Sequence, residues 1–171
     1  MRLSHLMLPG ALAAALALAA PSRAVTTFTA YLDGAQEATP NSSPGTGFGT
    51  VDLNDAEDSI TVNESWANLT AGATLSHIHT GPIGVAGPVT FPFNLGGAAG
   101  STSGSIPTQS FAITAAQVAT LKSGGMYMNV HTTNYPAGEI RGQCKPVPEP
   151  GSLALLASAL PLGLALRRRK V

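Results

Sequence analysis

Short runs in which apolar and polar residues alternate dominate the middle of the chain. Residues 27–33 (TFTAYLD) and 59–66 (SITVNESW) place apolar side chains at every second position over much of their length. A period of two is typical of a β-strand with one buried face. Turn-forming clusters such as residues 40–47 (PNSSPGTG) separate the runs. The pattern therefore predicts an all-β fold, an antiparallel β-sandwich or barrel.

One short helix interrupts the strand pattern near the end of the domain. Thr114 and Gln117 have the spacing of a capping box, in which both side chains satisfy free amide groups at a helix start. Gly124 suits the left-handed residue that follows a helix. We expect this helix to precede a final hairpin formed by residues 126–132 and 138–143.

The N-terminal residues 1–24 have the features of a secretory signal peptide. A positive start is followed by an apolar run and then by small residues before a cut between Ala24 and Val25. With the tail described next, this divides the chain into a signal peptide (1–24), a β domain (25–145) and a sorting segment (146–171).

The C-terminal segment combines three features in a fixed order. Pro148, Glu149 and Pro150 form a breaker motif, residues 153–166 are apolar, and residues 167–170 are basic. The order resembles the bacterial PEP-CTERM sorting signal. That resemblance implies a Gram-negative source, transient insertion of a transmembrane helix into the inner membrane, and removal of the tail by exosortase. The basic cluster would remain on the cytoplasmic side.

Removal of both ends would change the net charge of the protein. The whole chain is neutral, with 9 basic and 9 acidic residues. Residues 25–150 keep three basic residues, Lys122, Arg141 and Lys145, against all nine acidic ones, which gives a net charge of −6. A domain this acidic lacks the basic surface that nucleic-acid binding requires. Nucleic acid is therefore excluded as a partner.

The single cysteine, Cys144, excludes an internal disulfide. We expect it to be a free thiol on the tail of the domain.

Two closely spaced histidines are the main chemical feature of the sequence. His77 and His79 occupy positions i and i+2 of a predicted strand, so both side chains point to one face. With His131 from another strand they could form an open three-histidine metal site. Two histidines with Glu139 would instead form an iron-type facial triad.

A structural role for the same residues is an alternative to metal binding. The histidines could form a local hydrogen-bonded network, because buried polar groups need partners. In either case we expect the shared face of His77 and His79 to lie near His131. The three imidazoles should then lie within about 10 Å of one another, given strand spacings of ~4.8 Å and sheet spacings of ~10 Å.

Several separated motifs resemble one known family. Residues 32–37 (LDGAQE), 77–79 (HIH), 127–132 (YMNVHT) and 138–143 (GEIRGQ) are similar to the CHRD domain, named after chordin, in that order. The resemblance covers residues 26–143 and implies an all-β extracellular module. It implies no specific activity, so function must be argued from the site.

Two hypotheses for function follow. In the first, the chain is a non-enzymatic exported module of the cell envelope or extracellular matrix. Its partners would be signal peptidase, exosortase and exopolysaccharide or other envelope components, and it would reside at the cell surface or be secreted. In the second, it binds a divalent metal ion and has redox or hydrolytic activity. No cofactor is established by the sequence.

Overall fold

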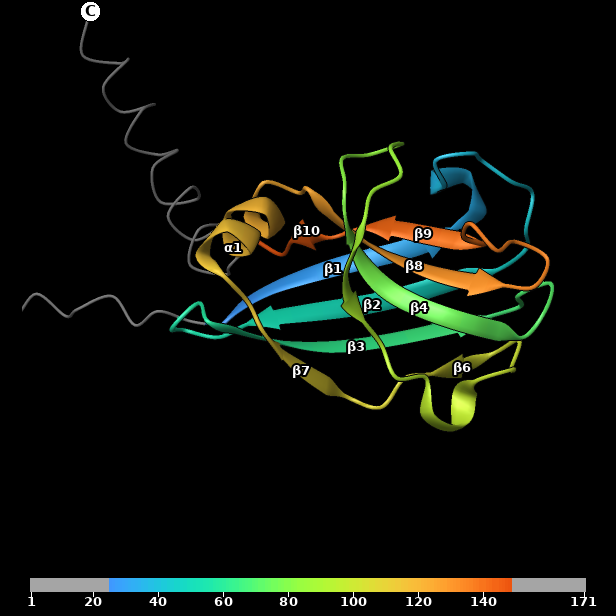
Figure 1. The fold of residues 1–171 in the computed structure, drawn as a ribbon, viewed down its shortest axis with the longest axis horizontal. Coiled ribbons are helices and arrows are strands. Elements are labelled where there is room, and N and C mark those ends of the chain that lie inside the picture. Colours follow the sequence, from blue (N-terminus) through green and yellow to red (C-terminus); the bar gives the residue numbers. More distant parts are fainter. Residues whose placement is uncertain (1–24, 149–171) are drawn as a thin grey trace, which may run out of the picture.

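A computed structural model of the protein describes residues 25–148, which form ten strands, one α-helix and two short 3-10 helices (Figure 1). The predicted signal peptide and most of the sorting segment, including Glu149 and Pro150, lie outside the described residues. The elements in chain order are β1 (Thr26–Asp33), η1 (Gly34–Gln36), β2 (Thr46–Leu53), β3 (Ser59–Ala67), β4 (Ala73–Thr80), β5 (Val89–Pro92), η2 (Gly96–Ala98), β6 (Gly104–Ser105), β7 (Gln109–Ala112), α1 (Ala115–Lys122), β8 (Met126–Thr132), β9 (Ile140–Gln143) and β10 (Lys145–Pro146).

The strands form one antiparallel sheet that is nearly closed into a barrel-like sandwich. The order is β5-β4-β8-β9-β1-β2-β3-β6, with β7 also paired to β3 and β10 to β1. The open seam lies between β5 and β7. There the Gln109 side chain accepts a hydrogen bond from the amide of Asn94 and donates one to its carbonyl. Phe111 also contacts the rings of Phe91 and Phe93 there. The predicted all-β antiparallel architecture is confirmed.

The alternation of the sequence fills the interior with apolar side chains. On β1 the side chains of Phe28, Ala30 and Leu32 are buried, and those of the residues between them are at least partly exposed. Burial of such side chains contributes about 1.5–3 kcal/mol each, which makes this core the main stabilising term. The other fully buried members are Val51, Leu53, Ile60, Val62, Ala73, Ile78, Leu121, Met126, Met128, Val130, Ile140 and Cys144. Cys144 is therefore part of the core, and the expectation of a thiol on a tail is wrong.

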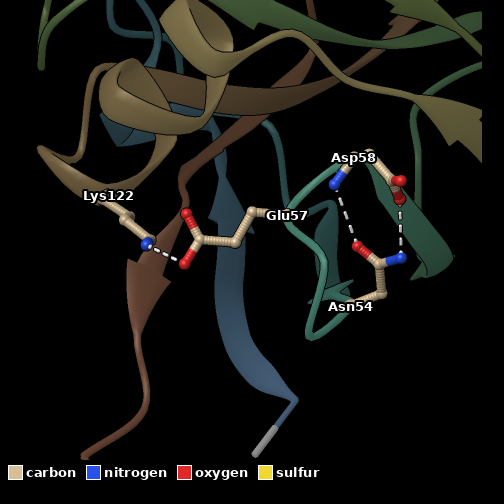
Figure 2. Close-up of polar contacts among 4 residues, drawn as sticks. All are labelled: Asn54, Glu57, Asp58 and Lys122. Carbon is tan, nitrogen blue, oxygen red and sulfur yellow. Dashed lines mark hydrogen bonds and ion pairs between the residues drawn. The ribbon is translucent and has the colours of Figure 1, made fainter. Parts of the chain in front are cut away.

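The helix α1 lies at one end of the sheet and has the predicted capping box. Its Leu121 is buried in the core, and Lys122 forms an ion pair of 2.7 Å with Glu57 in the β2–β3 turn. Figure 2 shows this pair beside Asn54 and Asp58, whose mutual hydrogen bonds hold the turn. None of the helices in residues 25–148 has the length and hydropathy that crossing a membrane requires.

The two halves of the sheet differ in how their outer faces are covered. Every residue of β8 and β9 is buried, so the outer face of these two strands is covered as well as the inner one. The segments that follow β1 and β4 contribute to this cover, since their groups hydrogen-bond to side chains of β8 and β9. Among residues 25–148, no segment covers the outer face of β1, β2 and β3 in this way, and the side chains of that face are partly or fully exposed.

Two polar residues are buried within the apolar interior. Glu64 on β3 and Ser76 on β4 are hydrogen-bonded to each other, and Ser76 Oγ also lies 3.1 Å from the carbonyl oxygen of Asn129. Burial raises the pKa of Glu64 to about 7, although the hydrogen bond from Ser76 acts in the opposite direction. Because a hydroxyl has a single proton to donate, both contacts of Ser76 are satisfied when the Glu64 carboxyl itself carries a proton.

The Glu64 carboxyl makes the stability of the fold depend on pH. Its pKa is higher in the folded than in the unfolded chain, so its contribution is full below about pH 4.5 and is lost as pH rises through about 7. Glu64→Gln keeps the shape without the charge. We expect its free energy of unfolding to rise by about 3 kcal/mol relative to wild type between pH 5 and pH 9.

Urea unfolding of both proteins at the two pH values measures this difference. Ser65→Ala, an exposed position on the same strand, serves as the control and should follow the wild-type curve. Parallel pH profiles for wild type and Glu64→Gln would contradict the assignment of a neutral buried carboxyl.

Candidate metal centre

The three histidines predicted from the sequence lie on one covered face of the sheet. His77 and His79 are on β4, which lies between β5 and β8. In the pairing of β4 with β8, His77 faces Asn129 and His79 faces Tyr127, and His131 faces Leu75 two positions beyond the first of these pairs. Directly opposed residues of antiparallel strands share a face. Strand register alone therefore brings the three imidazoles together.

The imidazole rings form a compact triangle. The ring centroids lie 5.3 Å apart for His77 and His79, 5.1 Å for His77 and His131, and 5.8 Å for His79 and His131. All three residues are buried, and one ring nitrogen from each lies within 4.8 Å of the others. The expected proximity of the three rings is confirmed.

Backbone carbonyls determine which nitrogen of two rings is free. His79 Nδ1 lies 2.9 Å from the carbonyl oxygen of Gly87, and His131 Nδ1 lies 2.9 Å from that of Pro136. A carbonyl only accepts hydrogen bonds, so each Nδ1 carries the proton and each Nε2 keeps a free lone pair. Those two Nε2 atoms and His77 Nδ1 are buried without a hydrogen-bond partner. Each histidine of the cluster thus has a buried ring nitrogen without a hydrogen-bond partner.

The surroundings keep all three imidazoles neutral. Burial, and to a smaller extent the neighbouring His131 and His79, lower the pKa of His77 to about 4. Burial likewise lowers the pKa of His79 and of His131, against the opposing effect of their carbonyl partners. Metal ions bind the neutral form of imidazole, so no proton competes with them near pH 7.

A stack of side chains supports His79 from behind. The Tyr127 ring lies parallel to the His79 ring, with centroids 4.9 Å apart, and the Arg141 guanidinium lies 3.4 Å from the centroid of Tyr127. Tyr127 Oη accepts a hydrogen bond from the amide of Gly87, and the carbonyl of Gly87 accepts one from His79 Nδ1. This arrangement fixes both the position and the tautomer of His79, in the way that residues hydrogen-bonded to a metal ligand orient that ligand.

The loop between β4 and β5, residues 81–88, is held by the same layer. Arg141 donates hydrogen bonds to the carbonyls of Pro82 and Val85, and Gln143 donates one to that of Gly81. A Cβ at Gly87 would lie 1.7 Å from Thr80 O, so the close return of the loop requires glycine there. Arg141 and Gln143 belong to the motif at residues 138–143, but their role in holding this loop follows only from strand register.

Glu139 is not brought to the histidines. Its carboxylate accepts hydrogen bonds from Ser43, Thr70 and Thr132. Burial alone would raise the pKa of Glu139, but these hydrogen bonds outweigh it and lower the pKa. The carboxylate therefore braces three segments of backbone. Among residues 25–148 it does not belong to the group that could hold a metal, which consists of the three histidines.

The donor set fits a first-row transition metal. Three neutral nitrogens without a carboxylate suit zinc or copper and do not suit magnesium or calcium, which prefer oxygen ligands. Metal–nitrogen bonds of ~2.1 Å at tetrahedral angles place ligand nitrogens roughly 3.4 Å apart. Small side-chain rotations would bring atoms that lie within 4.8 Å of one another to that spacing. Three protein ligands would leave a fourth position open.

A comparison with protein-family models matches residues 28–144 to the family described as the CHRD domain. The match spans well over half of the chain and includes the three histidines. No curated protein and no solved structure matches the chain.

The neutral state of His77 gives a prediction for the metal-free protein. For a base whose folded pKa is lowered, the contribution to stability is full above about pH 6.5 and is lost as pH falls through about 4. His77→Gln lacks this dependence. Wild type should therefore lose stability relative to His77→Gln over that range, by at most about 1.4 kcal/mol per pH unit.

Denaturant unfolding in the presence of a chelator, at pH 6.5 and at pH 4, measures this loss. Leu75→Ala, an exposed position on the same strand, is the control and should retain the wild-type dependence on pH. A constant difference between wild type and His77→Gln would show that His77 is not held neutral.

Proposed function

The chain belongs to the CHRD domain family, and from this premise we propose that it is an exported, extracellular-type module that binds one divalent transition-metal ion through His77, His79 and His131. The family match and the covered face of the sheet support a binding module. The proposed ligands are the three histidines, without Glu139.

A single observation carries the metal proposal: in a cluster of three buried imidazoles, each ring has a buried nitrogen without a hydrogen-bond partner. A buried polar atom without a partner costs about 1–3 kcal/mol. A purely structural network would be expected to satisfy these atoms, as it does the polar groups of Glu139, Asn129 and Arg141 around them. An ion that accepts all three lone pairs would remove the cost at once.

Titration of tag-free, chelator-treated protein with Zn²⁺ or Cu²⁺ tests the proposal. We expect one ion per chain by calorimetry and by elemental analysis. His77→Gln and His131→Gln should each weaken binding by about 100-fold or more, since a ligand matters at least as much as its supporting residues. Leu75→Ala, which removes an exposed side chain beside His131, should bind like wild type.

Wild-type affinity in the two histidine variants would overturn the metal proposal. So would substoichiometric binding by the wild-type protein. In either case the histidines would form a structural junction between β4 and the loop that follows it.

The route of export forms the second part of the proposal. The apolar run and small residues before Val25 support cleavage by signal peptidase. The motif at residues 148–150, with the apolar and basic segments that follow it, supports transient insertion in the inner membrane and cleavage by exosortase. The mature protein would then be at the cell surface or secreted, within the envelope or extracellular matrix.

Intact mass spectrometry of the protein from its native host checks this processing. We expect a chain that begins at Val25 and ends within residues 148–150. Detection of residues 151–171 in the secreted form would contradict cleavage by exosortase. Retention of residues 1–24 would contradict cleavage by signal peptidase.

A further inference from the structure

The uncovered outer face of β1, β2 and β3 carries a row of side chains that the metal proposal does not use. Tyr31, Phe48, Ser65 and Ser105 are consecutive partners across β1, β2, β3 and β6. Adjacent strands lie ~4.8 Å apart, so the row is roughly 15 Å long. It runs across the strands at the middle of the face, with no segment of residues 25–148 packed over it as the loops pack over β8 and β9.

Two aromatic rings stand exposed in this row. Tyr31 is 71% exposed and Phe48 is 38% exposed, and their ring centroids lie 5.0 Å apart. The other rings on neighbouring strands, Phe28 and Trp66, point into the core and are buried. Large exposed aromatic side chains that gather in one place typically mark a binding surface.

Hollows lie on both sides of the aromatic pair. One, of about 340 Å³, is lined by Tyr31 together with Gln36, Gln143 and Lys145 among others. On the other side two hollows of about 240 Å³ and 270 Å³ share Phe48 and Ser65. The pair therefore forms a ridge between depressions, and a chain-like ligand could lie across the ridge and fill both sides.

The side chains nearest the rings are polar, and charged groups are few among them. Thr29, Thr50, Asn63 and Ser65 present hydroxyl and amide groups to the face, and Lys145 stands at its margin. Asp33 and Asp52 share this face further along β1 and β2. The described residues as a whole carry three basic against eight acidic side chains. An acidic polymer would be repelled by this net charge. A lipid or an apolar protein surface would leave the hydroxyl and amide groups without partners.

We propose that the Tyr31–Phe48 ridge is a binding site for an uncharged oligosaccharide. A hexose ring has an apolar face of C–H groups that packs on an aromatic ring, and hydroxyls at its rim that bond to side chains such as Thr, Asn and Gln. The ridge supplies the first kind of contact and the lined hollows supply the second. The site lies on a different part of the sheet from the histidines and requires no metal ion.

Native electrophoresis in gels that contain a neutral hexose polymer tests the site. Hydroxyethylcellulose, laminarin and galactomannan are the probes, and alginate provides the acidic comparison. We expect at least one neutral polymer to retard the wild-type protein and alginate not to. Tyr31→Ala and Phe48→Ala should each bind about tenfold more weakly, the loss expected for one stacked ring.

Two further variants separate stacking from other effects. Tyr31→Phe retains the ring and should bind within about twofold of wild type. Ile83→Ala removes a side chain that is equally exposed, on the loop between β4 and β5, and should behave as wild type. Melting temperatures verify that each variant is folded. We expect little change, because these side chains are exposed and not part of the core.

The outcomes that overturn the proposal are specific. They are the absence of retardation by every neutral polymer, retardation by alginate alone, or equal retardation of wild type and both alanine variants. Repeating the gels with chelator and with Zn²⁺ keeps this result independent of the metal site. A failed metal titration leaves the sugar result unaffected, and the reverse also holds.

Discussion

The structure depends on how the polar groups on the outer face of β8 and β9 are satisfied once loops cover that face. Strand alternation gives these strands an apolar inner face, so their outer face carries Asn129, His131, Arg141 and Gln143. Burial of such groups is tolerated only with partners. The partners are mostly backbone carbonyls of the covering loops, and the hydrogen bonds that satisfy the side chains therefore also fix the loops. His79 on β4 takes part in the same way through Gly87.

The two faces of β4 border titratable groups of opposite kinds, an acid on the inner side and a base on the outer side. Ser76 points inward to Glu64, and its neighbour His77 points outward to the other histidines. Burial favours the uncharged form of both titratable groups, so it raises the pKa of the acid and lowers that of the base. As pH rises, the contribution of Glu64 to stability falls between about pH 4.5 and 7, and that of His77 rises between about pH 4 and 6.5. The two pH dependences therefore largely cancel, and each is revealed when the other group is replaced.

Much of the fold followed from local sequence patterns, and the parts that did not depend on register between distant strands. The alternation predicted the strands, Thr114 and Gln117 predicted the helix start, and the spacing of His77 and His79 predicted a shared face. Glu139 was a candidate ligand because the predicted strand over residues 138–143 pairs with that of His131, whereas β9 begins at Ile140. Its carboxylate instead binds Ser43 and Thr70, which are distant in the sequence and which no local pattern connects to it. Cys144 follows the last strand of the predicted hairpin, and only the tertiary packing shows that it is buried.

The arrangement around the histidines has a consequence for how tightly an ion would be held. A ligand that must change tautomer or rotamer on binding loses affinity, because part of the binding free energy is used for ordering. Here Gly87 and Pro136 already fix the protons of two rings on Nδ1, and Tyr127 and Arg141 already fix the plane of one ring. Binding through Nε2 of His79 would strengthen the Nδ1–H donor to Gly87, since coordination withdraws charge from the ring. The ion and the loop between β4 and β5 would therefore stabilise each other, and the loop would be more ordered with the metal bound than without it.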